Sequence, residues 1–360
     1  MAMASYASCK FPLVDEFKDY GEKNKVVGFI DSVLSGFGQI VLSDNPVTGL
    51  LVMLGIFLGA PSQLLAAVIA ACAASATAFL IGVNADLVRH GLYTFSGAIV
   101  GLGISLWGYS AQPVYPQLLI YAAIGGIVSV VVTAAINAFL SKWEAPSLSV
   151  PYCVTLMMLI PALLLTGKMD PQIYSLPQVG QVTDAFTELD VNTFFTSAVA
   201  GVGEICFQVG IPSGVCLMLA LLVSSRVDLV SAFCCAALGT GFAAVLGLPT
   251  DNILIGLYGY NAALVGMGLF GRAFRMSVGN AIFTAIMALF SVLLTAAMGV
   301  AFMPLGIPVA ALPFAVIVIM CVIGREHLSR FQPISILLWG VPETIEKALK
   351  VQEHSEKQAG

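Results

Sequence analysis

Long apolar stretches with almost no charge recur along the chain and constrain its fold more than any other feature. Residues 46–60, 62–83, 116–140, 227–247 and 276–301 each carry at most one charged residue, placed near an end. A helix needs about 20 apolar residues to cross the hydrocarbon core of a bilayer. Only 10% of the 360 residues are charged, whereas soluble domains carry about 25%. The sequence therefore predicts an all-α integral membrane protein.

Three phrases of the sequence occur twice, in the same order. They are "GQIVLSDNPVTGLL" at 38–51 with "GEICFQVGIPSGVCL" at 203–217, "GLYTFSGAIVG" at 91–101 with "GLYGYNAALVG" at 256–266, and "PSLSVPY" at 146–152 with "PVAALPF" at 308–314. The first two pairs have the same spacing along the chain, and the third is only slightly closer. This order predicts a tandem duplication. Its parts are an N-terminal segment (1–27), a first membrane repeat (28–166), a linker (167–194), a second repeat (195–324) and a C-terminal tail (325–360).

The distribution of basic residues predicts the orientation of the chain. Residues 1–28 and 325–360 hold nine of the fifteen Lys and Arg residues, whereas the linker carries Lys168 and four acidic residues. Basic segments stay on the cytoplasmic side, so we expect both termini in the cytoplasm of a plasma or inner membrane and the linker outside. Each repeat then has an odd number of spans, and the two repeats run in opposite directions. Transporters built from such inverted repeats bind their solute where the repeats meet.

Glu204 is an isolated carboxylate in an apolar setting, where such groups are costly and usually functional. Its counterpart in the first repeat is Gln39, which also offers a carbonyl-type oxygen. Paired oxygen acceptors without paired charges favour a neutral solute that donates hydrogen bonds. A structural role for Glu204 as a helix cap is the alternative. Its protonation state stays open, because burial and helix-end N–H groups act in opposite directions.

Together with "SKWEAP" at 141–146, these paired motifs resemble the urea transporter family over nearly the full membrane region. The resemblance implies two inverted repeats, each with five spanning helices and a tilted half-helix, and a homotrimer with one pore in each subunit. It also implies passive, channel-like movement of urea down its gradient through a narrow slot. The slot would combine flat apolar walls with a ladder of hydrogen-bond acceptors.

The resemblance assigns roles to individual positions of this chain. The plates of the slot would be Leu42 with Phe95 and Phe207 with Tyr260, flanked by Ile40 and Ile205; Gln39 and Glu204 would cap the oxygen ladders, Ile99 and Leu264 would narrow the middle, and Ser149 and Ala311 would stand at its centre. The chain departs from the family pattern at three of these positions. Leu42 replaces an aromatic residue, and Ser149 and Ala311 replace two threonines, which suggests a less polar centre.

Two alternatives to a urea channel stay open at this point. The departures allow a channel for short-chain amides or urea analogues, and Glu204 allows a proton-coupled secondary transporter. The sequence gives no support for an enzyme, because it shows no metal-ligand cluster and no catalytic pair in a shared apolar segment. We expect no cofactor and no metal, and the net charge of −5 gives no reason to expect a nucleic-acid partner.

Overall fold

The computed structural model describes residues 12–108, 116–164 and 190–359. These residues form helices joined by short turns, and within them β-structure is confined to isolated bridges, most of them around Phe274. The expected linker (167–194) and N-terminal segment (1–27) lie in part outside the described residues. The all-α class predicted from the apolar stretches is confirmed.

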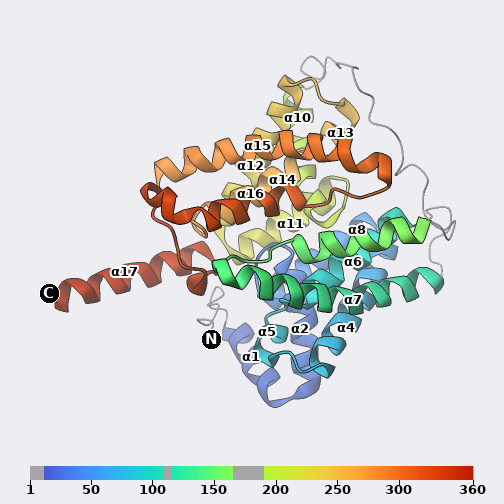
Figure 1. Ribbon diagram of the computed structural model, residues 1–360, viewed down its shortest axis with the longest axis horizontal. Helices are drawn as coiled ribbons and strands as arrows, with labels where there is room; N and C mark the ends of the chain where they lie inside the picture. Colours follow the sequence, from blue (N-terminus) through green and yellow to red (C-terminus); the bar gives the residue numbers. More distant parts are fainter. Residues whose placement is uncertain (1–11, 109–115, 165–189, 360) are drawn as a thin grey trace.

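The first half of the chain forms the lower part of the view in Figure 1, in blue to green. Its elements are α1 (Pro12–Lys23), α2 (Lys25–Gln39), α3 (Pro46–Gly59), α4 (Pro61–Leu80), α5 (Ala85–Arg89), α6 (Thr94–Trp107), α7 (Pro116–Leu140), the 3₁₀ turn η1 (Ser141–Trp143) and α8 (Val150–Leu164).

The second half repeats this order, from α2 onward, in the upper part of the view, in yellow to red. Its elements are α10 (Val191–Gly203), η3 (Glu204–Cys206), α11 (Ile211–Ser224), α12 (Arg226–Val245), α13 (Thr250–Leu254), α14 (Gly259–Leu269), α15 (Val278–Phe302), η4 (Met303–Leu305) and α16 (Leu312–Ile323). The tail adds η5 (Arg325–Phe331), η6 (Ile336–Leu338) and α17 (Pro342–Ala359), which projects away from the bundle.

The elements of the two halves correspond at the spacings read from the sequence. At the spacing of the first two phrase pairs, α3, α4 and α5 match α11, α12 and α13 at both ends of each helix. At the spacing of the third pair, α7 matches α15 at both ends. Residues with a left-handed backbone also match, since Leu42 has φ +58° and its counterpart Phe207 has φ +56°. The correspondence runs from Lys25 and from Val191, whereas the division at 28–166 and 195–324 stays a prediction.

The halves meet through counterpart elements. Helix α3 packs against α11, and α8 also contacts α16. Where the halves touch near the centre, Ser149 Oγ donates a hydrogen bond to the carbonyl of Ala311 at 2.7 Å. Ser149 and Ala311 are themselves counterparts in the third phrase pair. Because equivalent positions can only touch near the axis that relates two repeats, this bond marks where a pseudo-two-fold axis passes.

Four described helices are long and apolar enough to span a membrane, namely α4, α7 with η1, α12, and α15 with η4. The number rises to six if two bent helix pairs, α10 with α11 and α16 with η5, count as single spans. Shorter apolar helices such as α3, α6 and α8 complete the bundle. Among the described residues, the repeats that begin at α2 and at α10 each have six helices of at least eleven residues, the number expected from five spans and a half-helix.

Apolar side chains form matching exposed stripes on the two longest helices. On α7 the stripe includes Ile120 and Val131, which are 57% and 60% exposed, and on α15 their counterparts Ile282 and Leu293 are 59% and 44% exposed. Positions spaced three and four residues apart share one helix face. Such faces are stable against lipid or a neighbouring subunit, so the protein is an integral membrane protein.

Side-chain caps fix where several helices begin. The Asn45 side chain accepts from the backbone N–H of Val47, and Pro46 opens α3. Asp190 opens α10 by accepting from the backbone N–H of Thr193 at 2.6 Å. This bond holds the pKa of the Asp190 carboxyl below its usual value, because it favours the charged form.

Candidate functional site

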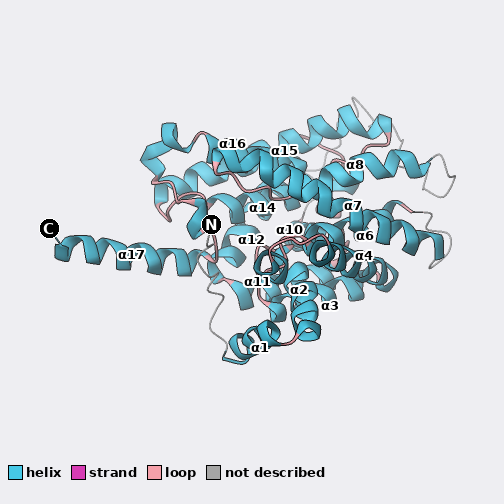
Figure 2. Cartoon of the chain, turned by 60° about the horizontal axis from the view of Figure 1, so that its bottom comes forward, coloured by secondary structure: helices cyan, strands magenta, loops and turns pink. Residues whose placement is uncertain are grey.

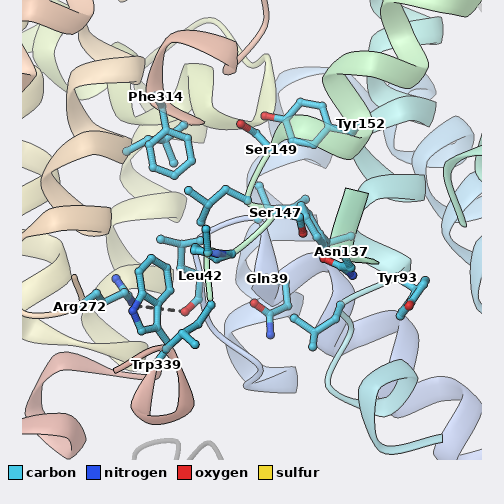
Figure 3. A pocket seen from close by; sticks show the side chains of 18 of the residues that line it. Gln39, Leu42, Tyr93, Asn137, Ser147, Ser149, Tyr152, Arg272, Phe314 and Trp339 are labelled. Carbon is cyan, nitrogen blue, oxygen red and sulfur yellow. Dashed lines mark hydrogen bonds between the residues drawn. The ribbon is translucent and has the colours of Figure 1, made fainter. Parts of the chain in front are cut away.

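A cavity of about 410 Å³ lies between the two halves. The first half contributes the turn after α2, the start of α6 and the loop that precedes α8; the second half contributes Ile205, Leu264, Arg272 and Phe314. The tail contributes Ile336, Trp339 and Gly340. In Figure 3, Gln39 and Asn137 approach from one side, and Arg272 and Trp339 stand on the other. The cavity is therefore a joint product of both repeats and the C-terminal segment.

The turn after α2 presents Gln39 to the cavity in a fixed orientation. Gln39 is the last residue of α2, and its Nε2 donates to the carbonyl oxygen of His90 at 2.8 Å. His90 Nδ1 in turn lies 2.8 Å from Asp44 Oδ2, and Lys18 Nζ lies 3.5 Å from the same oxygen. Because the amide nitrogen is used, the Oε1 atom of Gln39 remains as a hydrogen-bond acceptor.

The centre of the site combines one hydroxyl with flat rings. Ser149 lines the cavity and bonds to Ala311 across the repeat boundary. Phe95 and Tyr152 meet edge to face, with ring centroids 6.3 Å apart, and both line the cavity. The Tyr260 hydroxyl donates to the carbonyl of Ala310, close to the same boundary. The walls are mostly apolar, with a few oriented polar groups, which is typical of small-molecule sites.

Eight of the residues expected from the sequence line this cavity: Gln39, Ile40, Leu42, Phe95, Ile99, Ser149, Ile205 and Leu264. The other four are not part of its lining: Glu204, Phe207, Tyr260 and Ala311. These four are all buried and belong to the second half. Phe207 packs there against Trp107, with ring centroids 5.5 Å apart.

The cavity also contains residues that sequence reasoning did not single out. They are Asn137, Ser141, Glu144, Ser147, Tyr152, Arg272 and Trp339, among others. Aligning the two halves of the sequence could have identified some of these residues, because it shows polar residues in one half opposite apolar ones in the other. Asn137 and Ser147 stand where the second half has Gly299 and Val309, so at these positions the first half gives the cavity polar side chains where the second half has none.

Arg272 connects three parts of the molecule at one wall of the cavity. Its Nη1 and Nη2 bind the two carboxylate oxygens of Asp228 at 2.6 and 2.7 Å. The same guanidinium donates to the carbonyls of Leu42 at 3.1 Å and Met267 at 2.9 Å, and its Nε donates to Gly340 at 3.0 Å. Arg272 is 2% exposed and Asp228 is fully buried. A buried charge is tolerated only when it is paired and hydrogen-bonded. The Arg272–Asp228 pair meets both conditions.

Among the described residues, the lining offers no free charge for an ion. Its other charged residue, Glu144, is paired with Arg325. Within the part of the chain that the structure describes, no three His, Cys, Asp or Glu residues come together as a metal site would require. The arrangement is suited to holding a small neutral solute by hydrogen bonds.

Comparison with known proteins identifies the family. The family described as "Urea transporter" matches residues 30–326. Urea transporter 1 of Ovis aries is 25% identical over 301 residues, covering 81% of this chain and 76% of the relative, and the Capra hircus protein matches equally. Urea transporter 1 of Mus musculus is 23% identical over 275 residues, or 75% of this chain and 70% of the relative. With a match over most of its length and this all-helical architecture, the chain belongs to the urea transporter family.

Proposed function

We propose that this protein is a passive channel through which urea moves down its concentration gradient. The observation that carries the proposal is the cavity between the repeats, whose lining combines the polar residues Gln39 and Ser149 with apolar ones such as Phe95 and Ile99. Family membership supports transport of urea, and the relatives are named as transporters, which speaks against an enzyme.

The chemistry of urea fits such a lining. Urea is flat and uncharged, and each of its two NH₂ groups needs an acceptor to replace water. A polar group left without a partner in an apolar site loses about 1–3 kcal/mol. Oriented oxygens supply these bonds at little reorganisation cost, while apolar walls exclude hydrated ions. Selectivity then follows from the width of the slot and from its hydrogen bonds, as in channel filters.

The position of Glu204 favours a channel over a proton-coupled transporter. The other deeply buried acids near the path have partners, since Asp228 binds Arg272 and Asp44 binds His90. A proton relay needs a chain of titratable groups, and Glu204 is not part of the cavity lining. We therefore propose that Glu204 carries no proton across the membrane and serves as a hydrogen-bond acceptor outside the lining of this cavity.

Replacing Glu204 by glutamine is expected to leave urea flux largely intact and independent of pH. Glutamine already serves at the counterpart position, where Gln39 holds the His90 carbonyl. Proteoliposome uptake measured across a range of pH checks this. Loss of uptake together with loss of a pH dependence present in the native protein would favour the proton-coupled mechanism.

Replacing Ala311 by threonine is expected to raise the preference for urea over acetamide. The Ala311 carbonyl accepts from the Ser149 hydroxyl, so position 311 adjoins the cavity lining at Ser149, and a second hydroxyl there would offer an acceptor to the second NH₂ group that urea has and acetamide lacks. One hydrogen bond contributes about 0.5–1.5 kcal/mol, which corresponds to about a two- to tenfold change in the ratio of rates. An unchanged urea-to-acetamide ratio would contradict this role for position 311.

The function itself is tested by stopped-flow measurements on proteoliposomes with urea, acetamide, ammonium and water side by side. A urea channel gives fast urea flux, slower acetamide flux and no ammonium flux above empty vesicles. Acetamide flux that equals or exceeds urea flux would favour the short-chain amide alternative. Urea flux no faster than in empty vesicles would refute the proposal.

The proposal extends to orientation and assembly. The basic termini place both chain ends in the cytoplasm of a plasma or inner membrane. The matching apolar stripes on α7 and α15 supply surface for lipid and for subunit contacts in a homotrimer. Cross-linking of the purified protein in detergent should give a trimer band as the largest discrete species.

A further inference from the structure

The C-terminal segment between η5 and α17, residues 332–341, covers one wall of the cavity but lies outside the family match. That match ends at residue 326. The backbone N–H of Arg275 donates to the Gln332 carbonyl at 3.1 Å, and that of Ile334 donates to the Ala273 carbonyl at 2.9 Å. The start of the segment is thus attached to the turn between α14 and α15 of the second repeat.

Three further hydrogen bonds attach the far end of the segment and the adjoining start of α17. The Glu343 carboxylate accepts from the backbone N–H of Val227 at 3.1 Å and from the Ser225 hydroxyl at 2.8 Å, where α12 begins. Arg272 Nε donates to the Gly340 carbonyl. Since Arg272 also holds the Leu42 carbonyl, one guanidinium sets the position of the segment relative to the turn of the first repeat.

Trp339 is the large side chain that this segment places at the cavity. Its side chain is 9% exposed and lines the cavity together with Ile336. Figure 3 shows the indole beside Leu42 and Arg272. The C-terminal segment therefore adds a flat aromatic surface next to an aliphatic residue of the first repeat.

Comparison of the two repeats shows how this aromatic surface differs from the corresponding one in the other half. In the second half Phe207, the counterpart of Leu42, packs against Trp107. At the spacing that relates Leu42 to Phe207, the counterpart of Trp107 is Arg272. One end of the passage thus has an aromatic pair built from the repeats, whereas the other has Leu42 and Arg272. At that other end the indole comes from outside the repeats.

Packing alone does not explain an indole at this place. Trp339 Nε1 is buried and has no hydrogen-bond partner among the described residues. A buried donor without a partner is destabilising, and a phenylalanine of similar shape would avoid that cost. The indole offers more flat area than phenylalanine, which matters where a wall must fit a planar solute.

We propose that Trp339 is a specificity-determining residue of the solute path, where its indole and Leu42 together form the wall that restricts the cavity to thin planar solutes. This inference rests on the proposed function. Urea is planar, whereas the methyl hydrogens of acetamide project out of the amide plane. A wall that narrows the cavity therefore discriminates between the two.

The test compares acetamide and urea flux in proteoliposomes carrying Trp339→Ala, Trp339→Phe, the double variant Trp339→Ala/Leu42→Phe and the control Trp143→Ala. Trp143 is 43% exposed, packs on Phe139 and is not part of the cavity lining. We expect Trp339→Ala to raise the acetamide-to-urea ratio several-fold and Trp339→Phe, with its smaller flat ring, to raise it by a clearly smaller factor. The phenylalanine at position 42 should bring the ratio of the double variant back toward the native one, and the control should leave it unchanged.

Several outcomes would overturn the inference. They are a native ratio in monodisperse Trp339→Ala protein, a ratio in Trp339→Phe as high as in Trp339→Ala, no recovery in the double variant, or an equal shift in the control. If Trp339→Ala does not fold, Glu343→Ala loosens the segment from α12 instead and should shift the ratio in the same direction; a native ratio there counts against the inference. Absence of urea flux in the native protein refutes the proposed function and this inference together, whereas normal flux with constant ratios refutes the inference alone.

Discussion

Replacement of Arg272 by leucine is expected to be the most destabilising single change at the site. It leaves the fully buried Asp228 without its cationic partner, and it removes the donor from the carbonyls of Leu42, Met267 and Gly340. Removing one partner of a buried ion pair costs about 3–5 kcal/mol. The thermal midpoint of detergent-purified protein, followed by tryptophan fluorescence, should fall sharply or no monodisperse protein should be recovered.

Two related variants separate the loss of stability caused by breaking the ion pair from the loss caused by changing the shape of the side chain. The double variant Arg272→Leu/Asp228→Leu should recover much of the lost stability, because an apolar pair can replace a buried ion pair at little cost. Arg272→Lys keeps the charge but not the fork of donors, and it should fall between the native protein and Arg272→Leu. A native thermal midpoint for Arg272→Leu, or a double variant no more stable than the single one, would contradict this account.

Replacement of Gly91 by alanine is expected to remove both stability and urea flux. Gly91 has φ +76°, and a Cβ atom there would lie 2.4 Å from the backbone nitrogen of Gly36 and 2.5 Å from the carbonyl carbon of Ser35. Because both contacts are to backbone, the His90–Gly91 turn must move away from α2. The His90 carbonyl then no longer holds Gln39, which loses its orientation at the cavity.

Gly82 provides a matched control for backbone strain. It has φ +82°, but a Cβ atom there would meet nothing within 4 Å. Alanine at position 82 should therefore lower the free energy of unfolding only by the strain of its left-handed conformation, about 1–2 kcal/mol. Urea flux should stay unchanged. Equal losses of thermal midpoint in Gly82→Ala and Gly91→Ala would show that the close approach of Gly91 to α2 is not what matters.

The internal duplication was predictable from the sequence because both halves need the same residue types at the positions that form the same turns. Gly91 and Gly256 both have positive φ at the same turn, and Leu42 and Phe207 both follow the first helix of their repeat in a left-handed conformation. The spacings between the paired phrases therefore reappear as the spacings between paired helices.

The composition of the cavity was less predictable, because it depends on contacts between distant segments. Arg272 donates a hydrogen bond to the carbonyl of Leu42, 230 residues away. The sequence around Arg272 does not predict which distant residue it contacts. Trp339 lies in a tail that has no counterpart in the repeat. The repeat also treats its halves as equal, whereas this cavity takes most of its lining from the first half. Glu204 and Tyr260 are not part of that lining, and their roles in the solute path stay predictions.

The most direct test of the central claim is the initial rate of urea flux into proteoliposomes under imposed gradients. A passive passage between the repeats predicts the same rate with no gradient, with a proton or sodium gradient, and with a membrane potential, at equal urea concentration difference. A urea rate that follows the proton or sodium gradient, or accumulation of urea above its external concentration, would contradict it.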